Sequence, residues 1–123
     1  MYEATYMAML EDTTEQIREN ERRAFDTSIS LLKRARDSGR GTRDSMEALL
    51  FVNRLWTMLL EDLADQGNGL PESLRASLIS IGIWVLRRSE DIRQGQVDDF
   101  SALIEVSETI RNGLGRNIDV HSS

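Results

Sequence analysis

The residues whose type and spacing come nearest to catalysis are two pairs of adjacent carboxylates, Glu61-Asp62 and Asp98-Asp99. Two carboxylates aimed at one substrate can act as general acid and general base. Neighbouring residues of a helix point about 100° apart, however, so neither pair builds such a site by itself. Solvation or helix capping explains these residues better than acid–base chemistry.

Other catalytic signatures are missing from the sequence. The single histidine, His121, lies in a polar tail, and there is no cysteine to act as a nucleophile or a zinc ligand. The sequence contains no Gly-x-x-x-x-Gly-Lys loop for phosphate and no histidine and carboxylate spacing typical of a metal site. We therefore expect no catalytic residue, no cofactor and no metal, and a protein that is not an enzyme.

Basic residues gather at the end of the first predicted helix: Lys33, Arg34, Arg36, Arg40 and Arg43. Cations at this position complement the helix dipole, while contact with RNA or with an acidic protein is the alternative. The whole chain has a formal net charge of −6, which repels nucleic acid and anionic lipid at long range. Direct binding to nucleic acid or to a membrane is therefore not expected.

Length and composition indicate one domain in a reducing compartment. A chain of 123 residues can bury a single core, and the lack of cysteine fits the cytoplasm. No signal peptide is visible, and no apolar stretch reaches the roughly 18 residues of a membrane span. We expect a soluble cytoplasmic protein.

The positions of glycine and proline divide the chain into four helical segments, at residues 14–37, 42–66, 71–94 and 99–112. They predict an all-α fold, a single-domain bundle of four helices. Thr13 and Thr42 are the expected N-caps of the first two helices, and Pro71 suits the first position of the third. The helical domain spans residues 13–114. It is flanked by an N-terminal arm at residues 1–12 and a polar C-terminal tail at residues 115–123.

The N-terminal arm fits two patterns. Its apolar residues alternate as in a strand, whereas Tyr2, Tyr6 and Met9 share a helical face. An extended arm lying in a groove accounts for both the apolar content and the lack of a cap. We expect the two tyrosines to contact a partner, because tyrosine combines an apolar ring with a polar group.

Two apolar stretches that contain tryptophan, residues 49–60 and 78–86, dominate the chain. One face of the second helix is predicted core: Leu49, Val52, Trp56, Leu59, Leu60 and Leu63. Phe51, Leu55 and Met58 form a second stripe along its border. This stripe either packs beneath the first or fourth helix or stays free for a partner helix.

The third helix contains a glycine within its apolar arc and a tryptophan outside it. Gly82 costs about 1 kcal/mol of helix propensity relative to alanine, which predicts that a neighbouring helix approaches closely there. Trp84 is either covered by the N-terminal segment or first helix, or it anchors a partner. The predicted partner-binding residues are thus Tyr2, Tyr6, Phe51, Leu55, Met58 and Trp84.

Several short motifs follow one another in a specific order: Leu49-Leu-Phe-Val-Asn-Arg-Leu-Trp56, Glu61-Asp-Leu63, Leu70-Pro71, Leu78-Ile-Ser-Ile-Gly-Ile-Trp-Val85, Ile92-Arg-Gln-Gly95, Leu103-Ile-Glu-Val106 and Ile110-Arg-Asn-Gly-Leu114. Together they closely resemble the FlaF family of flagellar biosynthesis regulators of alpha-class proteobacteria. The resemblance runs from Tyr2 to about Leu114. The sequence departs from the family pattern at Arg87-Arg88-Ser89 and after Gly115.

The resemblance implies a small cytoplasmic helical protein that supports flagellin production and filament assembly. It also implies a link to flagellin synthesis after transcription, opposite a second regulator, FlbT, and binding of flagellin as a chaperone. Flagellin is therefore the expected partner, and FlbT is a candidate second partner. Flagellin termini are amphipathic helices that are unpaired before polymerisation, and a bundle with apolar grooves could cover them.

A regulator that acts on flagellin mRNA, directly or through a partner protein, is the alternative, and it would use the basic cluster. A purely structural helical subunit is the third possibility. We expect a flagellin-binding secretion chaperone and regulator. The oligomeric state and the part of flagellin that is bound are open at this point.

Overall fold

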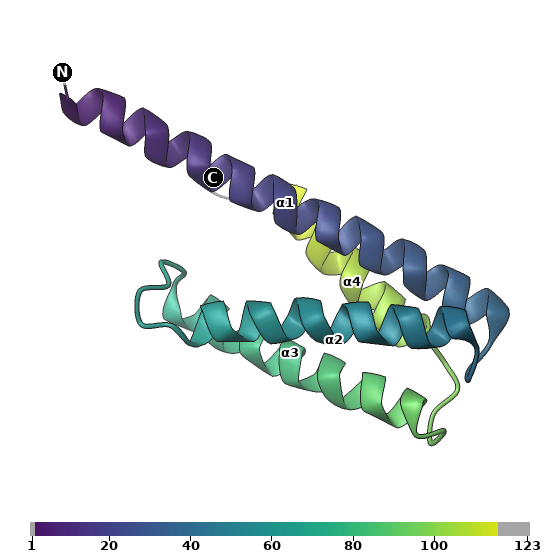
Figure 1. Cartoon of the computed structure of the whole chain (residues 1–123). Helices are drawn as coiled ribbons and strands as arrows, with labels where there is room; N and C mark the ends of the chain where they lie inside the picture. The colour runs from purple at the N-terminus through teal and green to yellow at the C-terminus, as the bar shows by residue number, and fades with distance from the viewer. Residues whose placement is uncertain (1, 116–123) are drawn as a thin grey trace.

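The computed structural model describes the backbone of residues 2–115 and the side-chain surroundings of residues 19–113. It contains four helices: α1 (Tyr2–Ser38), α2 (Arg43–Ala64), α3 (Glu72–Arg93) and α4 (Ser101–Gly115). No strand occurs between residues 2 and 115. The predicted all-α bundle is confirmed (Figure 1).

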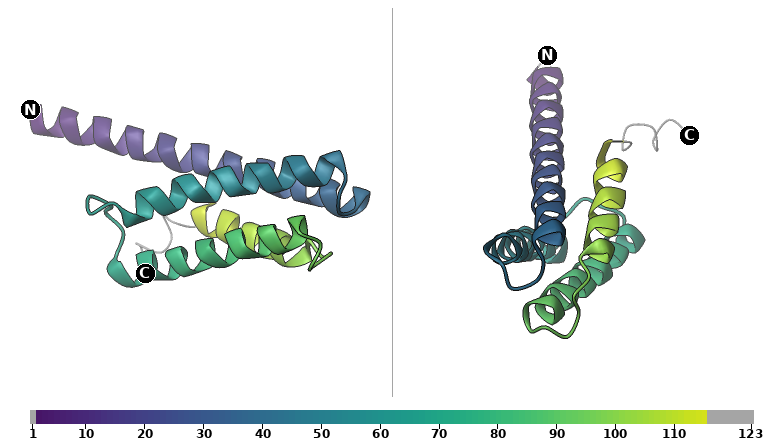
Figure 2. Two further views of the ribbon diagram at one scale, coloured as in Figure 1. Left: turned by 60° about the horizontal axis from the view of Figure 1, so that its bottom comes forward. Right: turned by 90° about the vertical axis from the view of Figure 1, so that its right-hand side faces the viewer.

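The helices are not packed equally against one another. α1 packs along both α2 and α4, and α2 also packs along α3, whereas α3 and α4 barely touch. α2 and α3 run antiparallel beneath α1, and α1 diverges from both of them toward its N-terminus (Figures 1 and 2). The bundle is therefore closed around α1 and α2 and less tightly closed between α3 and α4.

The core consists of apolar side chains from every helix and from the loop before α4. Phe25 of α1 meets Trp56 of α2 edge to face, with ring centroids 5.9 Å apart and an interplanar angle of 81°, a favourable arrangement for aromatic pairs. Both rings are only 2% exposed. Of the six residues predicted for the core face of α2, Leu49, Val52, Trp56 and Leu63 are buried, and Leu59 and Leu60 are half-buried.

Glycines at the end of α1 and a capping threonine before α2 lie where the sequence predicts these helix ends. Gly39 and Gly41 have positive φ angles of 94° and 81° after α1, a conformation that favours glycine. The Thr42 side-chain oxygen then accepts a hydrogen bond from Ser45 N at 3.2 Å, which caps α2. Pro71 is the N-cap of α3 and not its first residue, a difference of one position at a helix end.

The extended arm expected at residues 1–12 is wrong over residues 2–12, the part of it that the structure describes. α1 already begins at Tyr2 and runs without interruption to Ser38, so Thr13 lies inside the helix and does not cap it. The sequence contains no glycine or proline before Gly39, and nothing local stops the helical pattern that Tyr2, Tyr6 and Met9 had suggested. Figure 1 shows this part of α1 extending beyond the other helices.

The close approach predicted at Gly82 is confirmed. Gly82 is buried in α3, and a β-carbon placed on it would lie 2.7 Å from Leu60 Cδ2 and 2.9 Å from Trp56 Cε3. Glycine thus lets α3 lie against the large side chains of α2. Within the described residues, no helix combines the length and the apolar character needed to cross a membrane.

Candidate functional site

The predicted partner-binding residues differ in their exposure. Met58 is 68% exposed, whereas Phe51, Leu55 and Trp84 are half-buried. Leu55 and Trp84 pack against the core. The side chains of Tyr2 and Tyr6, the other two predicted residues, lie outside the described part of the structure.

Met58 and Trp84 do not form one surface. Residues two positions apart on a helix point about 200° apart. Since Trp56 faces Gly82 across the contact between α2 and α3, Met58 points away from α3, and Trp84 likewise points away from α2. The predicted residues therefore lie on at least two faces of the bundle.

Trp84 also has a neighbour that the sequence analysis did not anticipate. The guanidinium carbon of Arg88, one turn later in α3, lies 5.4 Å from the centroid of the Trp84 ring. This is a cation–π distance. The ring thus packs against the core and lies beside Arg88, and its role as a partner anchor stays a prediction.

Two further exposed apolar residues of α2 were not among the predicted partner-binding residues. Met46 is 69% exposed and Leu50 is 52% exposed, and both line an open groove of about 1040 Å³ between α2 and α3. Its other lining residues include Leu49 and Asn53 of α2 and Glu90, Ile92 and Arg93 of α3. We call this surface the α2/α3 groove. The i, i+4 spacing of Met46 and Leu50 outside the core face was the signal that could have identified it.

The charged residues that α3 contributes to this groove are paired with each other, while α2 adds Arg43 and Glu47. Arg93 Nε donates to Glu90 Oε2 at 2.8 Å, and Gln94 Nε2 donates to Glu90 Oε1 at 2.9 Å. The hydrogen bond from Arg93 is the main cause that lowers the pKa of the Glu90 carboxyl. The groove thus has apolar lining residues and, on its α3 side, a carboxylate that is paired with an arginine of the same helix.

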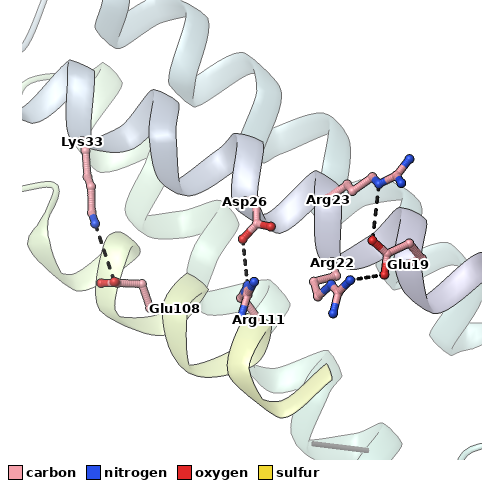
Figure 3. A network of polar contacts seen from close by, with 7 residues as sticks. All are labelled: Glu19, Arg22, Arg23, Asp26, Lys33, Glu108 and Arg111. Atoms are coloured by element: carbon pink, nitrogen blue, oxygen red, sulfur yellow. Dashed lines mark hydrogen bonds and ion pairs between the residues drawn. The ribbon is translucent and has the colours of Figure 1, made fainter. Parts of the chain in front are cut away.

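Two exposed ion pairs link α1 and α4. Arg111 Nε donates to Asp26 Oδ1 at 2.8 Å, and Lys33 Nζ lies 3.7 Å from Glu108 Oε2 (Figure 3). Further along α1, Glu19 accepts from Arg22, and this bond is the main cause that lowers the pKa of Glu19. These contacts are structural, because the side chains point toward one another and not toward a shared pocket.

The basic cluster is largely paired with carboxylates of the same chain. Besides the Lys33 pair, Arg36 Nε lies 3.3 Å from Asp37 Oδ1 and Arg40 Nε lies 3.7 Å from Asp98 Oδ1. All of these side chains are solvent-exposed, so the pairs are weak. They nevertheless reduce the positive field that an RNA-binding site would need.

Three of the four carboxylate residues of these pairs make contacts within the chain. Asp98 pairs with Arg40, and Asp99 Oδ1 accepts from Ser101 N at 2.8 Å at the start of α4. Asp62 accepts hydrogen bonds from Asn68 Nδ2 in the loop after α2. Among the described residues, no group of three or more potential ligands could hold a metal ion. His121 lies outside the described residues.

Comparison with known families assigns the chain to a family. The model of the family described as "Flagellar protein FlaF" matches residues 2–114, which is nearly the whole chain of 123 residues. The chain therefore belongs to the FlaF family and is a flagellar protein. Comparisons with curated proteins and with solved structures gave no significant match.

Proposed function

We propose that this FlaF-family protein is a cytoplasmic chaperone that binds flagellin and supports flagellin synthesis and filament assembly, without catalysis or a cofactor. The observation that carries the proposal is the exposed apolar pair Met46 and Leu50 above the α2/α3 groove. Large apolar side chains at a groove are typical of surfaces that bind another protein.

The groove suits an amphipathic helix. Such a helix is recognised through anchors at i, i+3, i+4 and i+7, which pack between the side chains of two neighbouring helices. Methionine is adaptable enough to repack around different apolar anchors. The terminal helices expected of flagellin have this character, and covering them would prevent premature polymerisation.

The alternative, post-transcriptional control through direct contact with flagellin mRNA, is less well supported. Of the five cations in the basic cluster, Lys33, Arg36 and Arg40 have carboxylate partners. An effect on flagellin synthesis fits better with an indirect route, through bound flagellin or through FlbT as a second partner. The same flagellin-binding surface would then serve both roles.

Calorimetric titration with full-length and terminally truncated flagellin tests the proposal. We expect binding of the full-length protein and loss of binding when the interacting terminus is removed. Leu50→Glu should weaken binding by about tenfold or more, since it places a charge in the apolar contact. Ser30→Glu, at an exposed position of α1, is the matched control and should bind normally.

Met58→Glu completes the comparison, because Met58 was predicted as a contact from the sequence and lies on another face of α2. Weakening by Met58→Glu alone would move the binding surface from the α2/α3 groove to that face. No measurable binding of full-length flagellin by the unmodified protein would refute the proposed function.

A further inference from the structure

We propose that the outward face of α2 pairs with the same face of a second copy of this chain, with the two α2 helices antiparallel. The outward face is the exposed side of α2 that points away from the core, and it is formed by Arg43, Met46, Leu50, Arg54, Met58 and Glu61. The inference goes beyond the proposed function, because it concerns the protein without a client.

The outward face of α2 has an apolar ridge. Met46, Leu50 and Met58 are each more than half exposed. With Arg54 they follow an i, i+4 row, which forms a continuous ridge along a helix. Trp56, two positions from both Arg54 and Met58, points to the opposite side and is buried. Figure 1 shows α2 in front of α3 and α4. The exposure of the ridge means that no described part of the chain covers it.

The charges on this side of α2 lack partners. Arg43, Glu47, Arg54 and Glu61 are all exposed, and none of them forms an ion pair within the described residues. The four charges alternate in sign along the helix and sum to zero. A surface of this kind can pair with a copy of itself even though the whole chain is acidic.

Two of these charges lie at unfavourable ends of their own helix. Arg43 is the first residue of α2, where the helix dipole disfavours a cation, and Glu61 is in the last turn, where the dipole disfavours an anion. An antiparallel second α2 reverses both effects, because its C-terminal end lies beside Arg43 and its N-terminal end beside Glu61. The second copy thus satisfies two charges that conflict with the isolated helix.

Antiparallel pairing brings complementary side chains together. Met46 and Met58 are each six positions from position 52, and Arg43 and Glu61 are each nine positions from it. With a twofold axis near position 52, Met46 therefore faces Met58 of the second copy. Arg43 faces Glu61 of the second copy, and each contact occurs twice because the interface is isologous.

The centre of the ridge fits the same arrangement. Leu50 and Arg54 are each two positions from position 52, so Leu50 faces the aliphatic stem of Arg54 of the second copy. Glu47, about one turn from Leu50, is then near the same guanidinium. A parallel pair would instead place each residue against itself, with like charges opposed at Arg54. The charges therefore select the antiparallel orientation.

A single pair of helices is a small interface, below about 1,200 Å² in total, which is typical of weak complexes. We expect a dissociation constant of about 10–100 μM, so that the monomer prevails at about 1 μM protein. Met46 and Leu50 also line the α2/α3 groove. A second copy and a client helix then compete for these side chains, and this competition is the one consequence that rests on the proposed function.

Sedimentation velocity of the full chain, from about 1 to 500 μM, tests the pairing. We expect a monomer–dimer equilibrium. Arg43→Glu and Glu61→Arg should each weaken it by about tenfold at low salt, although they change the net charge in opposite directions, because each opposes like charges at both ends of the pair. Arg87→Glu, at an exposed position of α3 without an ion pair, is the matched control and should associate normally.

Charge exchange gives the sharper readout. An equimolar mixture of Arg43→Glu and Glu61→Arg forms a heterodimer in which both opposite-charge contacts are restored, so it should associate as tightly as the unmodified protein. The double variant should do the same. Both substitutions complement the dipole of their own helix, so we expect the variants to stay folded, which circular dichroism checks.

A protein that stays monomeric at about 500 μM would overturn the inference. Single variants that associate as tightly as the unmodified protein would also overturn it, since the dimer would then use another surface or orientation. Met58→Glu should weaken association by about tenfold or more. Flagellin titrations at about 1 μM protein, where the monomer prevails, test the proposed function separately. Dimerisation without flagellin binding would refute that function and leave the α2 pair standing.

Discussion

Gly82 of α3 lies against Trp56 of α2, where an added β-carbon would come within 2.9 Å of Trp56 Cε3. It would also lie 2.7 Å from Leu60 Cδ2. The Leu60 side chain can rotate away, but Trp56 is fixed by its contact with Phe25. The space between these two helices therefore depends on glycine.

Gly82→Leu should lower the free energy of unfolding by about 1–3 kcal/mol, because overpacking forces the two helices apart. Thermal melting followed by circular dichroism measures the effect. Gly113→Ala is the control, since nothing lies within 4 Å of a β-carbon at Gly113 in α4. It should leave stability unchanged or raise it by up to about 1 kcal/mol through helix propensity.

Truncation of Trp56 and Met58 should have opposite outcomes for stability. Trp56 is 2% exposed and Met58 is 68% exposed. Trp56→Ala should cost about 3–5 kcal/mol, while Met58→Ala should change stability by no more than about 0.5 kcal/mol. Urea unfolding would measure both. A large loss for Met58→Ala would mean that the residue is covered in solution, for example by self-association.

The basic cluster should be dispensable for flagellin binding. Replacement of Arg34, Arg36 and Arg40 together by Glu should change affinity by less than about tenfold, or 1.4 kcal/mol. Exposed charges act mainly on association rate and salt dependence. Calorimetry at low and high salt provides the measurement. Loss of binding at every salt concentration contradicts the prediction, and retained binding with lost control of flagellin mRNA favours the RNA alternative.

Ser28 should be replaceable by alanine without loss of stability. Its side chain is 1% exposed, and its hydroxyl has no hydrogen-bond partner among the described residues. An unpaired buried hydroxyl costs about 1–3 kcal/mol, so Ser28→Ala should raise the melting temperature. Ser89→Ala is the matched control, because the Ser89 hydroxyl donates to Val85 O at 2.8 Å. A lower melting temperature for Ser28→Ala alone would show that its hydroxyl is paired in solution.

The start of α4 should weaken in acid. The hydrogen bond from Ser101 N–H holds the pKa of Asp99 below its ordinary value. Because the pKa of Asp99 is lower in the folded protein than in the unfolded chain, its ionised form stabilises the folded state. This stabilisation is fully present above the pKa of the unfolded chain, which is about 4. It is lost as the pH falls through the pKa of Asp99 in the folded protein. Hydrogen exchange of α4 amides over this range would detect the change. Asp99→Asn, which can still accept the bond, should reduce this pH dependence.

The sequence alone predicted the features that depend on local conformation and periodicity. Helix ends at Gly39 and Gly95 follow from backbone angles that favour glycine, and the cap at Thr42 follows from its side-chain oxygen. The core face around Val52 and Trp56 follows from the helical repeat. Each of these depends on residues within a few turns of one another.

Tertiary packing alone decided which border of each helix stays exposed. Phe51 and Leu55 are half-buried, whereas Met46 and Leu50 are exposed, because exposure at a border depends on where the neighbouring helix lies. Leu74 shares a row with the buried Val85 and is exposed only because α4 does not cover it. Helical periodicity tells which residues share a face, but coverage of that face is set by helices distant in the chain.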